Sequence, residues 1–283
     1  LLIFSLLIFE KKLRSRSKYH EILNSKPSSE KKLLNKNKSI IAICCCSIPL
    51  ALGFFIPVSR MISWAWISRN SASELDGIEL IGNSLGLATI TSLTIVAIAT
   101  FLVFSARYYK SAITYFSNRL AILGYSIPGA VIAIGILLFV AQVNHLTNYV
   151  LTGSLYLLIF AYIVRYLAVA WQPINAGIES NCDSLNHASQ TLGSSAYTSL
   201  TRVNLPLIKD TIITAGLLVF IDTVKELPLT LILRPFNFET LSTATFDLSS
   251  QAQIAESSIP ALYMIMIVLA PLIFLNYRLE NIE

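Results

Sequence analysis

Charge is the scarcest property of this sequence. Only 13% of its 283 residues are Asp, Glu, Lys or Arg, whereas about 25% of an ordinary soluble domain is charged. Hydrophobic residues make up 54% of the chain, and they come in runs long enough to cross a bilayer, each bounded by polar residues. The sequence therefore excludes an ordinary soluble domain and predicts an integral membrane protein.

Signatures of nucleotide, metal and redox chemistry are also lacking. No G-x-x-x-x-G-K-[ST] pattern occurs, so the sequence has no P-loop for ATP. The three histidines are scattered, and Cys44, Cys45 and Cys46 are consecutive within an apolar run, which is not a metal-ligand spacing. We therefore expect no metal site in this chain and no cofactor bound by it.

Basic residues are few outside one segment, which argues against a nucleic-acid partner. Ten of the 21 Lys and Arg residues lie in residues 10–39, between two apolar segments. In a membrane protein a basic, hydrophilic link of this kind usually lies in the cytoplasm. We interpret residues 10–39 as a basic cytoplasmic linker and residues 40–283 as a transmembrane domain.

Long apolar runs predict the fold. Six stretches are long enough to span a bilayer, namely 40–59, 80–104, 120–141, 152–171, 211–233 and 259–276. Residues 1–9 form a further apolar run without a start Met, a basic n-region or a cleavage pattern, and are interpreted as the severed end of another membrane helix. The predicted fold is all-α, a polytopic transmembrane helical bundle with six complete spans and a severed N-terminal helix end.

The distribution of Lys and Arg between alternate loops predicts the orientation. Residues 10–39, 105–119, 172–210 and 277–283 together hold 16 of them, and the loops on the other side hold three. Cytoplasmic loops carry the excess of Lys and Arg in membrane proteins. We therefore predict a multi-pass protein of the cell inner (plasma) membrane, with a cytoplasmic C-terminus and lipid around its spans.

The loop at 172–210 is longer than a link between two helices requires, and such loops are usually functional or disordered. This one carries helix signals. Residues 183–184 can cap a helix that ends at Gly193, and a second short helix is stopped by Leu205-Pro206. The pattern predicts a helix–Gly–helix elbow that serves as a docking surface for a partner.

The same loop resembles the EAA loop of ABC-importer permeases. That pattern has E-A-A, three residues, a glycine, nine residues, an aliphatic residue, one residue and a Leu-Pro ending, and all its spacings are matched by His187, Ala188, Ser189, Gly193, Val203, Leu205 and Pro206. The resemblance implies a coupling helix that fits a cleft on an ABC ATPase subunit. His187 stands where the family usually has an acid, which questions a salt bridge from that position and leaves the shape fit intact.

Other stretches resemble the ferric-iron branch of these permeases. The strongest likeness is D-T-V-K-E-L-P-L-T-L-I-L-R-P-F-N-F-E-T-L at 222–241, and L-G-Y-S-I-P-G-A-V-I-A-I-G at 123–135 is similar to that branch's tyrosine–proline–glycine helix. N-S-L at 83–85 and Y-H at 19–20 also fit. Together they cover nearly the whole chain and resemble the C-terminal half of a two-halved permease.

The resemblance has consequences for function. It implies ferric iron delivered by an external binding protein and moved into the cytoplasm by alternating access. ATP would be used by partner subunits, and a missing N-terminal half or a second permease subunit would complete the permease. Thiamine, sulfate or another small ion remains the alternative substrate within the same class.

Three ionisable residues, Asp222, Lys225 and Glu226, fall inside a predicted span, where charged groups are costly and usually functional. Their spacing places them on one helix face. In one interpretation they line the substrate path or a gate. In the other, Asp222 and Lys225 form an internal pair and Glu226 lies near the outer interface.

Two arginines have simpler interpretations. Arg165 falls near the cytoplasmic end of its span, where its side chain can extend to the interface. Arg234 begins the outer loop R-P-F-N-F-E, where it either meets a delivering binding protein or acts as an ordinary interfacial anchor.

One hydrolase-like pattern has a structural alternative. G-N-S-L-G at 82–86 matches the nucleophile elbow G-x-S-x-G, which needs a preceding strand and a histidine in reach. No strand is predicted before Ser84, and the three histidines are placed in loops, His145 outside and His20 and His187 in the cytoplasm. Gly82 and Gly86 are also a pair of small residues four apart, which favours close helix packing. We therefore expect no catalytic residue and no enzyme, with a membrane hydrolase as a remote alternative.

Overall fold

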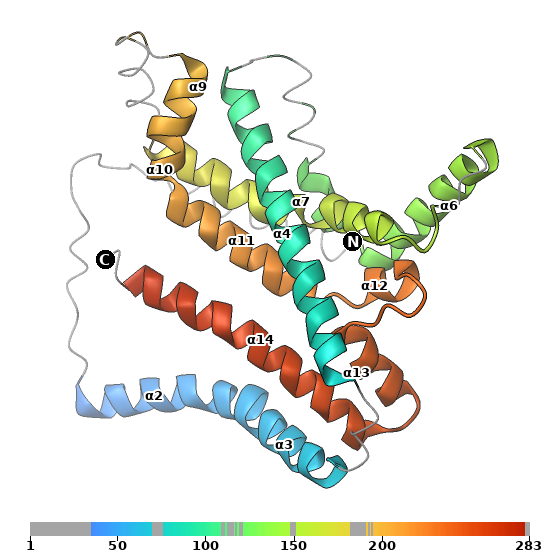
Figure 1. The fold of residues 1–283 in the computed structure, drawn as a ribbon. Coiled ribbons are helices and arrows are strands. Elements are labelled where there is room, and N and C mark those ends of the chain that lie inside the picture. The colour runs from blue at the N-terminus through green and yellow to red at the C-terminus, as the bar shows by residue number, and fades with distance from the viewer. Residues whose placement is uncertain are drawn as a thin grey trace, which may run out of the picture. The chain divides into compact units, whose positions relative to one another are not determined.

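The computed structural model describes residues 35–69, 76–108, 121–147, 151–181 and 195–280, together with residues 111, 116, 118, 191 and 193. Every regular element in these ranges is a helix (Figure 1). The chain divides into two compact units, residues 1–53 and 54–283. The predicted stub at 1–9 and most of the basic linker lie outside the described residues.

The described part of the first unit is helical. Helix α2 (Lys36–Leu50) begins after Asn35, whose side-chain oxygen accepts a hydrogen bond of 2.8 Å from the Lys36 N–H. This bond satisfies one of the amides that a helix start leaves open. Pro49 lies in the last turn of α2, and a π-helical turn, η1 (Ala51–Phe55), follows it directly.

Five helical runs are long and apolar enough to cross a membrane, namely Lys36–Ser68, Gly77–Ala106, Gly129–Leu146, Leu155–Glu179 and Ile254–Tyr277. In the second unit they belong to α3 (Ile56–Ser68), α4 (Gly77–Tyr108), α6 (Gly129–Thr147), α7 (Leu155–Asn181) and α14 (Ile254–Glu280). Each run corresponds to a predicted span. The prediction of an all-α polytopic bundle is confirmed.

Two spans differ from their predicted limits. Helix α6 begins at Gly129 rather than at residue 120, because Ile127 is extended, with ψ at 133°, as is usual before a proline such as Pro128. A short 3-10 turn, η3 (Gly124–Ser126), precedes it. Helix α7 continues to Asn181, past the predicted end at residue 171, and so takes up part of the predicted loop.

The predicted span 211–233 is not one continuous helix, because the chain forms two helices there. Helix α11 (Lys209–Val224) ends at Lys225, and α12 (Pro228–Leu233) begins after Leu227. Pro228 has no N–H to donate to the Val224 carbonyl, so α11 cannot continue through it. At the first position of α12 the missing N–H costs nothing, since that amide would have no helical partner.

The second helix of the elbow also differs from its prediction. Helix α9 (Ala196–Ser199), the π-helical turn η4 (Leu200–Asn204) and α10 (Leu205–Leu207) follow without a break. The Leu205 N–H donates to the Leu200 carbonyl, five residues back, and this wider turn brings Pro206 into the start of α10. Leu205-Pro206 therefore does not stop the helix, which ends before Ile208.

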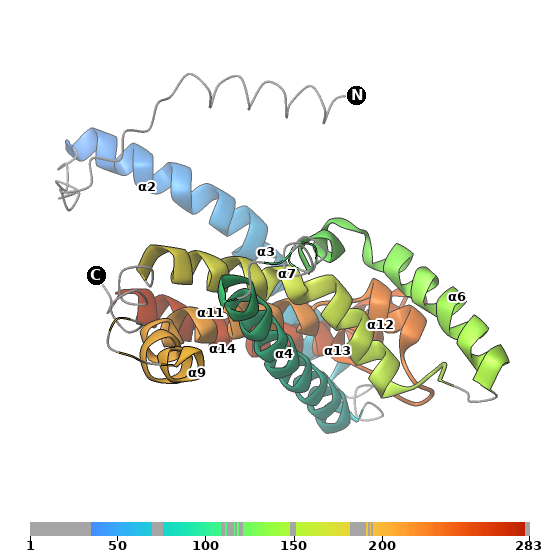
Figure 2. The same ribbon diagram turned by 90° about the horizontal axis from the view of Figure 1, so that it is seen from above.

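Helices α4, α7 and α11 pack against one another and form the main core of the second unit (Figures 1 and 2). Their fully buried side chains include Ile95, Leu158, Tyr162, Ile174 and Val219. Helix α13 (Leu241–Ser250) packs against α14, and α14 packs against α3. In a bilayer such helices are held by close packing and polar contacts, since lipid tails are as apolar as the side chains.

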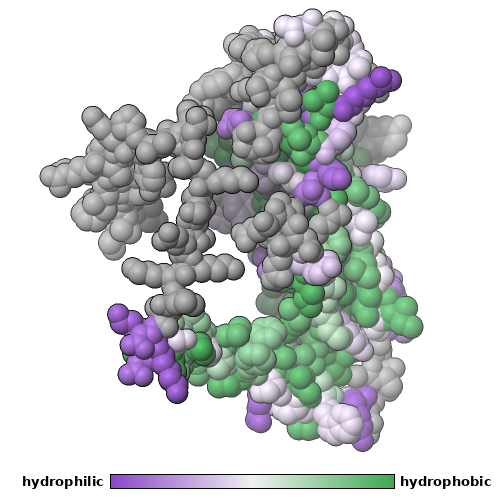
Figure 3. All heavy atoms as spheres, turned by 90° about the vertical axis from the view of Figure 1, so that its left-hand side faces the viewer, coloured by the Kyte–Doolittle hydropathy of each residue, from purple (hydrophilic) through white to green (hydrophobic). Residues whose placement is uncertain are grey.

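Large apolar side chains also remain exposed. In the second unit they include Ile78, Leu93, Phe101, Leu138 and Phe139. Apolar side chains cover much of the described surface on the face drawn in Figure 3. Soluble monomers rarely expose apolar areas of this extent, so the surface fits a protein surrounded by lipid.

Candidate functional site

The candidate site lies where α11 breaks and α12 begins. Asp222 is in the last turn of α11, and its carboxylate lies 2.7 Å from Lys225 Nζ. This confirms the internal pair of the second interpretation. The Lys225 side chain remains 58% exposed. Glu226 lies beyond the helix end, so the predicted single helix face for all three residues is wrong.

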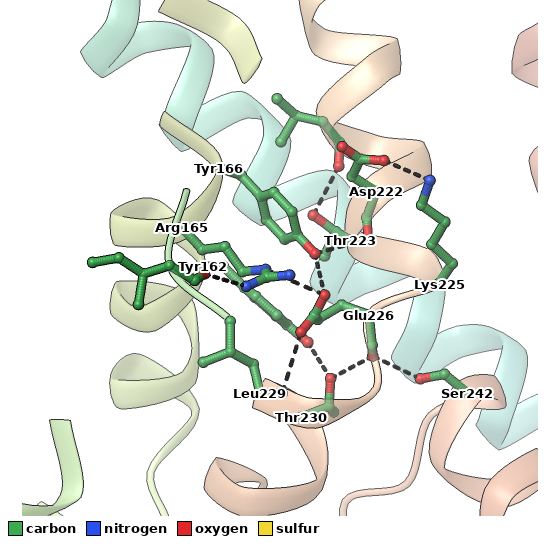
Figure 4. A network of polar contacts seen from close by, with 12 residues as sticks. Tyr162, Arg165, Tyr166, Asp222, Thr223, Lys225, Glu226, Leu229, Thr230 and Ser242 are labelled. Atoms are coloured by element: carbon green, nitrogen blue, oxygen red, sulfur yellow. Dashed lines mark hydrogen bonds and ion pairs between the residues drawn. The ribbon is translucent and has the colours of Figure 1, made fainter. Parts of the chain in front are cut away.

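Glu226 is the buried centre of the site, with a side chain only 7% exposed (Figure 4). One carboxylate oxygen, Oε2, accepts a hydrogen bond from the Tyr166 hydroxyl and lies 3.4 Å from Arg165 Nε. The other, Oε1, accepts a bond of 3.3 Å from the Leu229 N–H. A buried carboxylate needs such partners, so Glu226 is held from both α7 and α12.

Arg165 points inward rather than toward the interface, and its predicted extension to the interface is wrong. Its side chain is 19% exposed. Besides its ion pair with Glu226, Nη1 donates a hydrogen bond of 3.0 Å to the Ile127 carbonyl. Its guanidinium also lies 5.6 Å from the centre of the Tyr166 ring. Arg165 therefore joins α7 to two segments that are distant in sequence.

Side chains supply the hydrogen bonds that the helix break removes. The Glu226 carbonyl accepts from Thr230 Oγ1 at 2.8 Å and from Ser242 Oγ at 2.9 Å (Figure 4). The Tyr166 hydroxyl also lies 3.2 Å from the Asp222 carbonyl, and Tyr162 pairs with the Thr230 hydroxyl. Irregular backbone at membrane depth is stable only where protein or water satisfies it, and here protein does.

Two glycines of the segment similar to the tyrosine–proline–glycine helix fit against this site. A Cβ at Gly129 would lie 2.7 Å from Glu226 Oε1 and 3.0 Å from Arg165 Nη1. A Cβ at Gly124 would lie 1.8 Å from the Val164 carbonyl oxygen. The two stretches with the ferric-permease resemblance, 123–135 and 222–241, therefore meet at Arg165 and Glu226.

The loop after α12 is fixed by ion pairs. Arg234 Nη2 lies 3.0 Å from Asp247 Oδ2, and Nη1 lies 3.5 Å from Glu239 Oε1. The loop presents Phe236, which is 92% exposed, next to Asn237 in a left-handed conformation with φ at 58°. The structure thus uses Arg234 to hold the loop to α13.

Ser84 has a structural partner. It is buried, and its Oγ accepts a hydrogen bond of 2.8 Å from the Leu241 N–H at the start of α13. The neighbouring Asn83 donates from Nδ2 to the Glu239 carbonyl at 3.0 Å. Apart from the neighbouring residues and the backbone of α4 itself, no described atom lies within 4 Å of a Cβ placed at Gly82 or Gly86. The expected close packing at these glycines is therefore absent from the described residues, and Ser84 serves to position α13.

The predicted coupling loop is described only in part. His187, Ala188 and Ser189 lie outside the described residues. Gly193 has φ at +80°, the conformation of a glycine that ends a helix. The remaining motif residues, Val203, Leu205 and Pro206, belong to the continuous run of η4 and α10.

Sequence reasoning missed Tyr162, Arg165 and Tyr166 as parts of the site. Their spacing places them on one face of α7, and this was the available signal. Chemically, the arrangement can hold a buried carboxylate and a broken helix in one position. No group of three His, Cys, Asp or Glu side chains that could hold a metal occurs in the described part of the chain.

Similarity to known proteins identifies the class. Residues 98–282 match the family described as "Binding-protein-dependent transport system inner membrane component". The chain is 29% identical to the "Fe(3+)-transport system permease protein FbpB 2" of Haemophilus influenzae, over 77% of this chain and 44% of that protein. It is 26% identical to the "Putative 2-aminoethylphosphonate transport system permease protein PhnV" of Salmonella typhimurium, over 56% of each chain.

Solved structures agree on the fold. A chain of a bacterial alginate ABC transporter, crystallised with an alginate pentasaccharide-bound periplasmic protein, matches with a TM-score of 0.71 and 16% identity, over 87% of this chain and 95% of that one. The chain spans about half the length of the curated relatives it matches. The family match covers more than half of this chain. The protein therefore belongs to the binding-protein-dependent transport system inner membrane components, which are ABC-transporter permeases of the membrane and not enzymes.

Proposed function

We propose that this permease moves ferric iron, delivered by an external binding protein, into the cytoplasm. The observation that carries the proposal is the 29% identity with the ferric-iron permease of Haemophilus influenzae over 77% of this chain. The likeness to the 2-aminoethylphosphonate permease is lower, at 26%, and covers only 56% of the chain. Iron is therefore the favoured cargo.

The proposed mechanism is alternating access driven by partner subunits. The chain binds no cofactor in this proposal, and ATP is used by ABC ATPase subunits at the cytoplasmic face. A second permease half, either in the same polypeptide or as a separate subunit, completes the path. The elbow and the C-terminus face the cytoplasm, in keeping with the Lys and Arg distribution.

The proposed contact with the ATPase is the loop between α7 and α11. His187, Ala188 and Ser189 supply its surface, and Gly193 sets the turn between its two helical parts. The position of α9 and α10 supports this assignment, because they lie at the start of α11, at the opposite end from α12 (Figure 1). Movement of this loop would therefore act on both flanking helices.

The proposed substrate path runs past the break after α11. Discontinuous helices with charged residues commonly form substrate sites in transporters. Of the three candidate residues, Lys225 is exposed, its partner Asp222 is partly buried, and Glu226 is buried under Arg165. Asp222 and Lys225 are therefore the groups that a passing substrate can meet, and Glu226 maintains the gate behind them.

The proposed outer contact is the loop after α12. Phe236 is highly exposed on a loop whose ends are fixed by Arg234 and α13. A rigid loop with one exposed aromatic residue suits contact with an external binding protein. Less conformational entropy is lost on binding when the loop is already held in one conformation. Arg234 supports the loop and is not itself the contact.

Reconstitution tests the proposal. The full-length permease is placed in liposomes with its ATPase and binding protein, and ATP-dependent uptake of labelled ferric iron is followed. Excess 2-aminoethylphosphonate, thiamine or sulfate is added in turn. Iron uptake that needs all components and resists these competitors is the expected result. Uptake of labelled 2-aminoethylphosphonate in place of iron would overturn the assignment of ferric iron as the substrate. It would support 2-aminoethylphosphonate, the second candidate, which the Salmonella relatives favour.

A further inference from the structure

The two helices that flank the predicted coupling loop are connected a second time, far from that loop. Helix α7 leads into the loop and α11 leads out of it, and the two helices pack along each other. Arg165 lies 16 residues before Asn181 at the end of α7, or about 24 Å at 1.5 Å per helical residue. Its partner Glu226 lies just past the opposite end of α11.

This second connection is built from buried side chains together with Arg165, which is 19% exposed. From α7, Arg165 and Tyr166 both contact the Glu226 carboxylate, and Tyr162 pairs with Thr230 in α12 (Figure 4). Each contact crosses from α7 to the break between α11 and α12. A buried carboxylate with three partners cannot leave one of them without leaving a polar group unsatisfied, so the arrangement favours one position over intermediate ones.

A third segment is included in the connection. Arg165 Nη1 donates to the Ile127 carbonyl, and the space at Gly129 is filled by the Arg165 and Glu226 side chains. The start of α6 is therefore fitted directly onto the ion pair. The Asp222–Lys225 ion pair is separate from this one, and its Lys225 side chain is 58% exposed.

We propose that Arg165 and Glu226 form a clamp that makes α7, the start of α6 and the α11–α12 break move as one body when the coupling loop moves. The role of the clamp in transport rests on the proposed importer function. The contacts that form the clamp do not depend on that function. Arg165, Tyr166 and Glu226 are positioning residues in this scheme. They hold the gate region in register with the loop, and substrate meets other groups.

Hydrogen–deuterium exchange of the full-length permease in nanodiscs tests the clamp without requiring transport. Glu226→Gln should speed amide exchange in segments 124–131 and 225–233 by about tenfold or more, since buried partners lose a charged acceptor. Glu79→Gln removes the same charge from an exposed position in the first turn of α4 and is the matched control. Unchanged exchange in both segments of Glu226→Gln would overturn the clamp.

A double variant separates loss of the pair from loss of the fold. Arg165→Met with Glu226→Gln leaves no charge buried alone, so exchange should be no faster than in Arg165→Met by itself. Strictly additive acceleration would show that the two residues act independently and would overturn the clamp.

Coupling is read from substrate transported per ATP hydrolysed in liposomes. Glu226→Gln should keep ATP hydrolysis and lose most but not all of its uptake, whereas Glu79→Gln should keep both. An unchanged ratio in Glu226→Gln, together with faster exchange, would overturn the coupled movement. If the wild type takes up no candidate substrate, the proposed function fails while the exchange comparison still decides on the clamp.

Discussion

The two ends of α11 are built in different ways. At its start, the chain passes through Gly193 at positive φ and then through a helical run with a π-helical turn before Ile208. At its end, Glu226 lies in a buried network that joins α7, α12 and α13. The first end is marked by unusual backbone conformations and the second by a buried ion pair. The polar groups left open by the helix break are satisfied within the protein, as an irregular segment of a membrane protein requires.

The largest effect on folding is expected from adding one methyl group at Gly124, next to the buried network. Gly124→Ala should abolish folded protein, because its Cβ would lie 1.8 Å from the Val164 carbonyl oxygen and the backbone of α7 cannot give way. Gly135→Ala in α6 is the matched control, since no described atom lies within 4 Å of that Cβ. Size-exclusion profiles of the detergent-purified variants measure this. A monodisperse, stable Gly124→Ala would show that the close contact with α7 is not required.

The next effect compares two ion pairs at the same break. Arg165→Gln leaves Glu226 buried without its cation and should lower the free energy of unfolding by about 3–5 kcal/mol. Lys225→Gln removes the cation of the exposed pair and should cost about 0–1 kcal/mol. Thermal unfolding in detergent provides both values. Equal losses would mean that burial does not distinguish the two pairs.

The third prediction concerns the loop before α11 and changes the residue that holds the positive φ there, Gly193. Gly193→Val should uncouple ATP hydrolysis from uptake while leaving the unfolding temperature of the membrane helices unchanged, because β-branched residues resist φ near +80°. Gly193→Asn is the control, since asparagine tolerates that region. Wild-type uptake in Gly193→Val would contradict the elbow assignment.

The smallest effect lies at the turn between α13 and α14, beyond the buried network. Ala252 has φ at 63°, and the N–H of Gln253 donates to the Leu248 carbonyl at 3.0 Å, as in a Schellman ending that normally uses glycine. Ala252→Gly should therefore raise the free energy of unfolding by about 1 kcal/mol. Gln251→Gly, at φ of −87°, should not stabilise. A stabilising Gln251→Gly would show that φ is not the cause.

Local properties of the sequence predicted most of the fold. Five of the six spans predicted from apolar runs correspond to long apolar helices, because length and hydropathy are properties of each segment alone. The break at Pro228 was missed for the same reason. Residues 211–233 are apolar on average, and hydropathy does not register the backbone hydrogen bond that Pro228 removes. Pro128 shortened α6 in the same way.

The site was harder to predict because its contacts are not local. Asp222 and Lys225 are three residues apart, so their pair could be proposed from spacing. Arg165 and Glu226 belong to different helices, and only the tertiary fold brings them together. Gly129 is a second example. A side chain at this position would collide with Arg165 and Glu226, which belong to two segments distant in sequence.

Whether the two ends of α11 act in one movement is tested most directly by a double-mutant cycle. Substrate transported per ATP hydrolysed is measured in liposomes for the wild type, Gly193→Val, Glu226→Gln and the double variant. Substitutions at residues that act in one coupled movement have non-additive effects. The double variant should therefore transport no less substrate per ATP than the single variant with the lower ratio. Losses that simply multiply would contradict the account, because each end would then act on transport by a separate route.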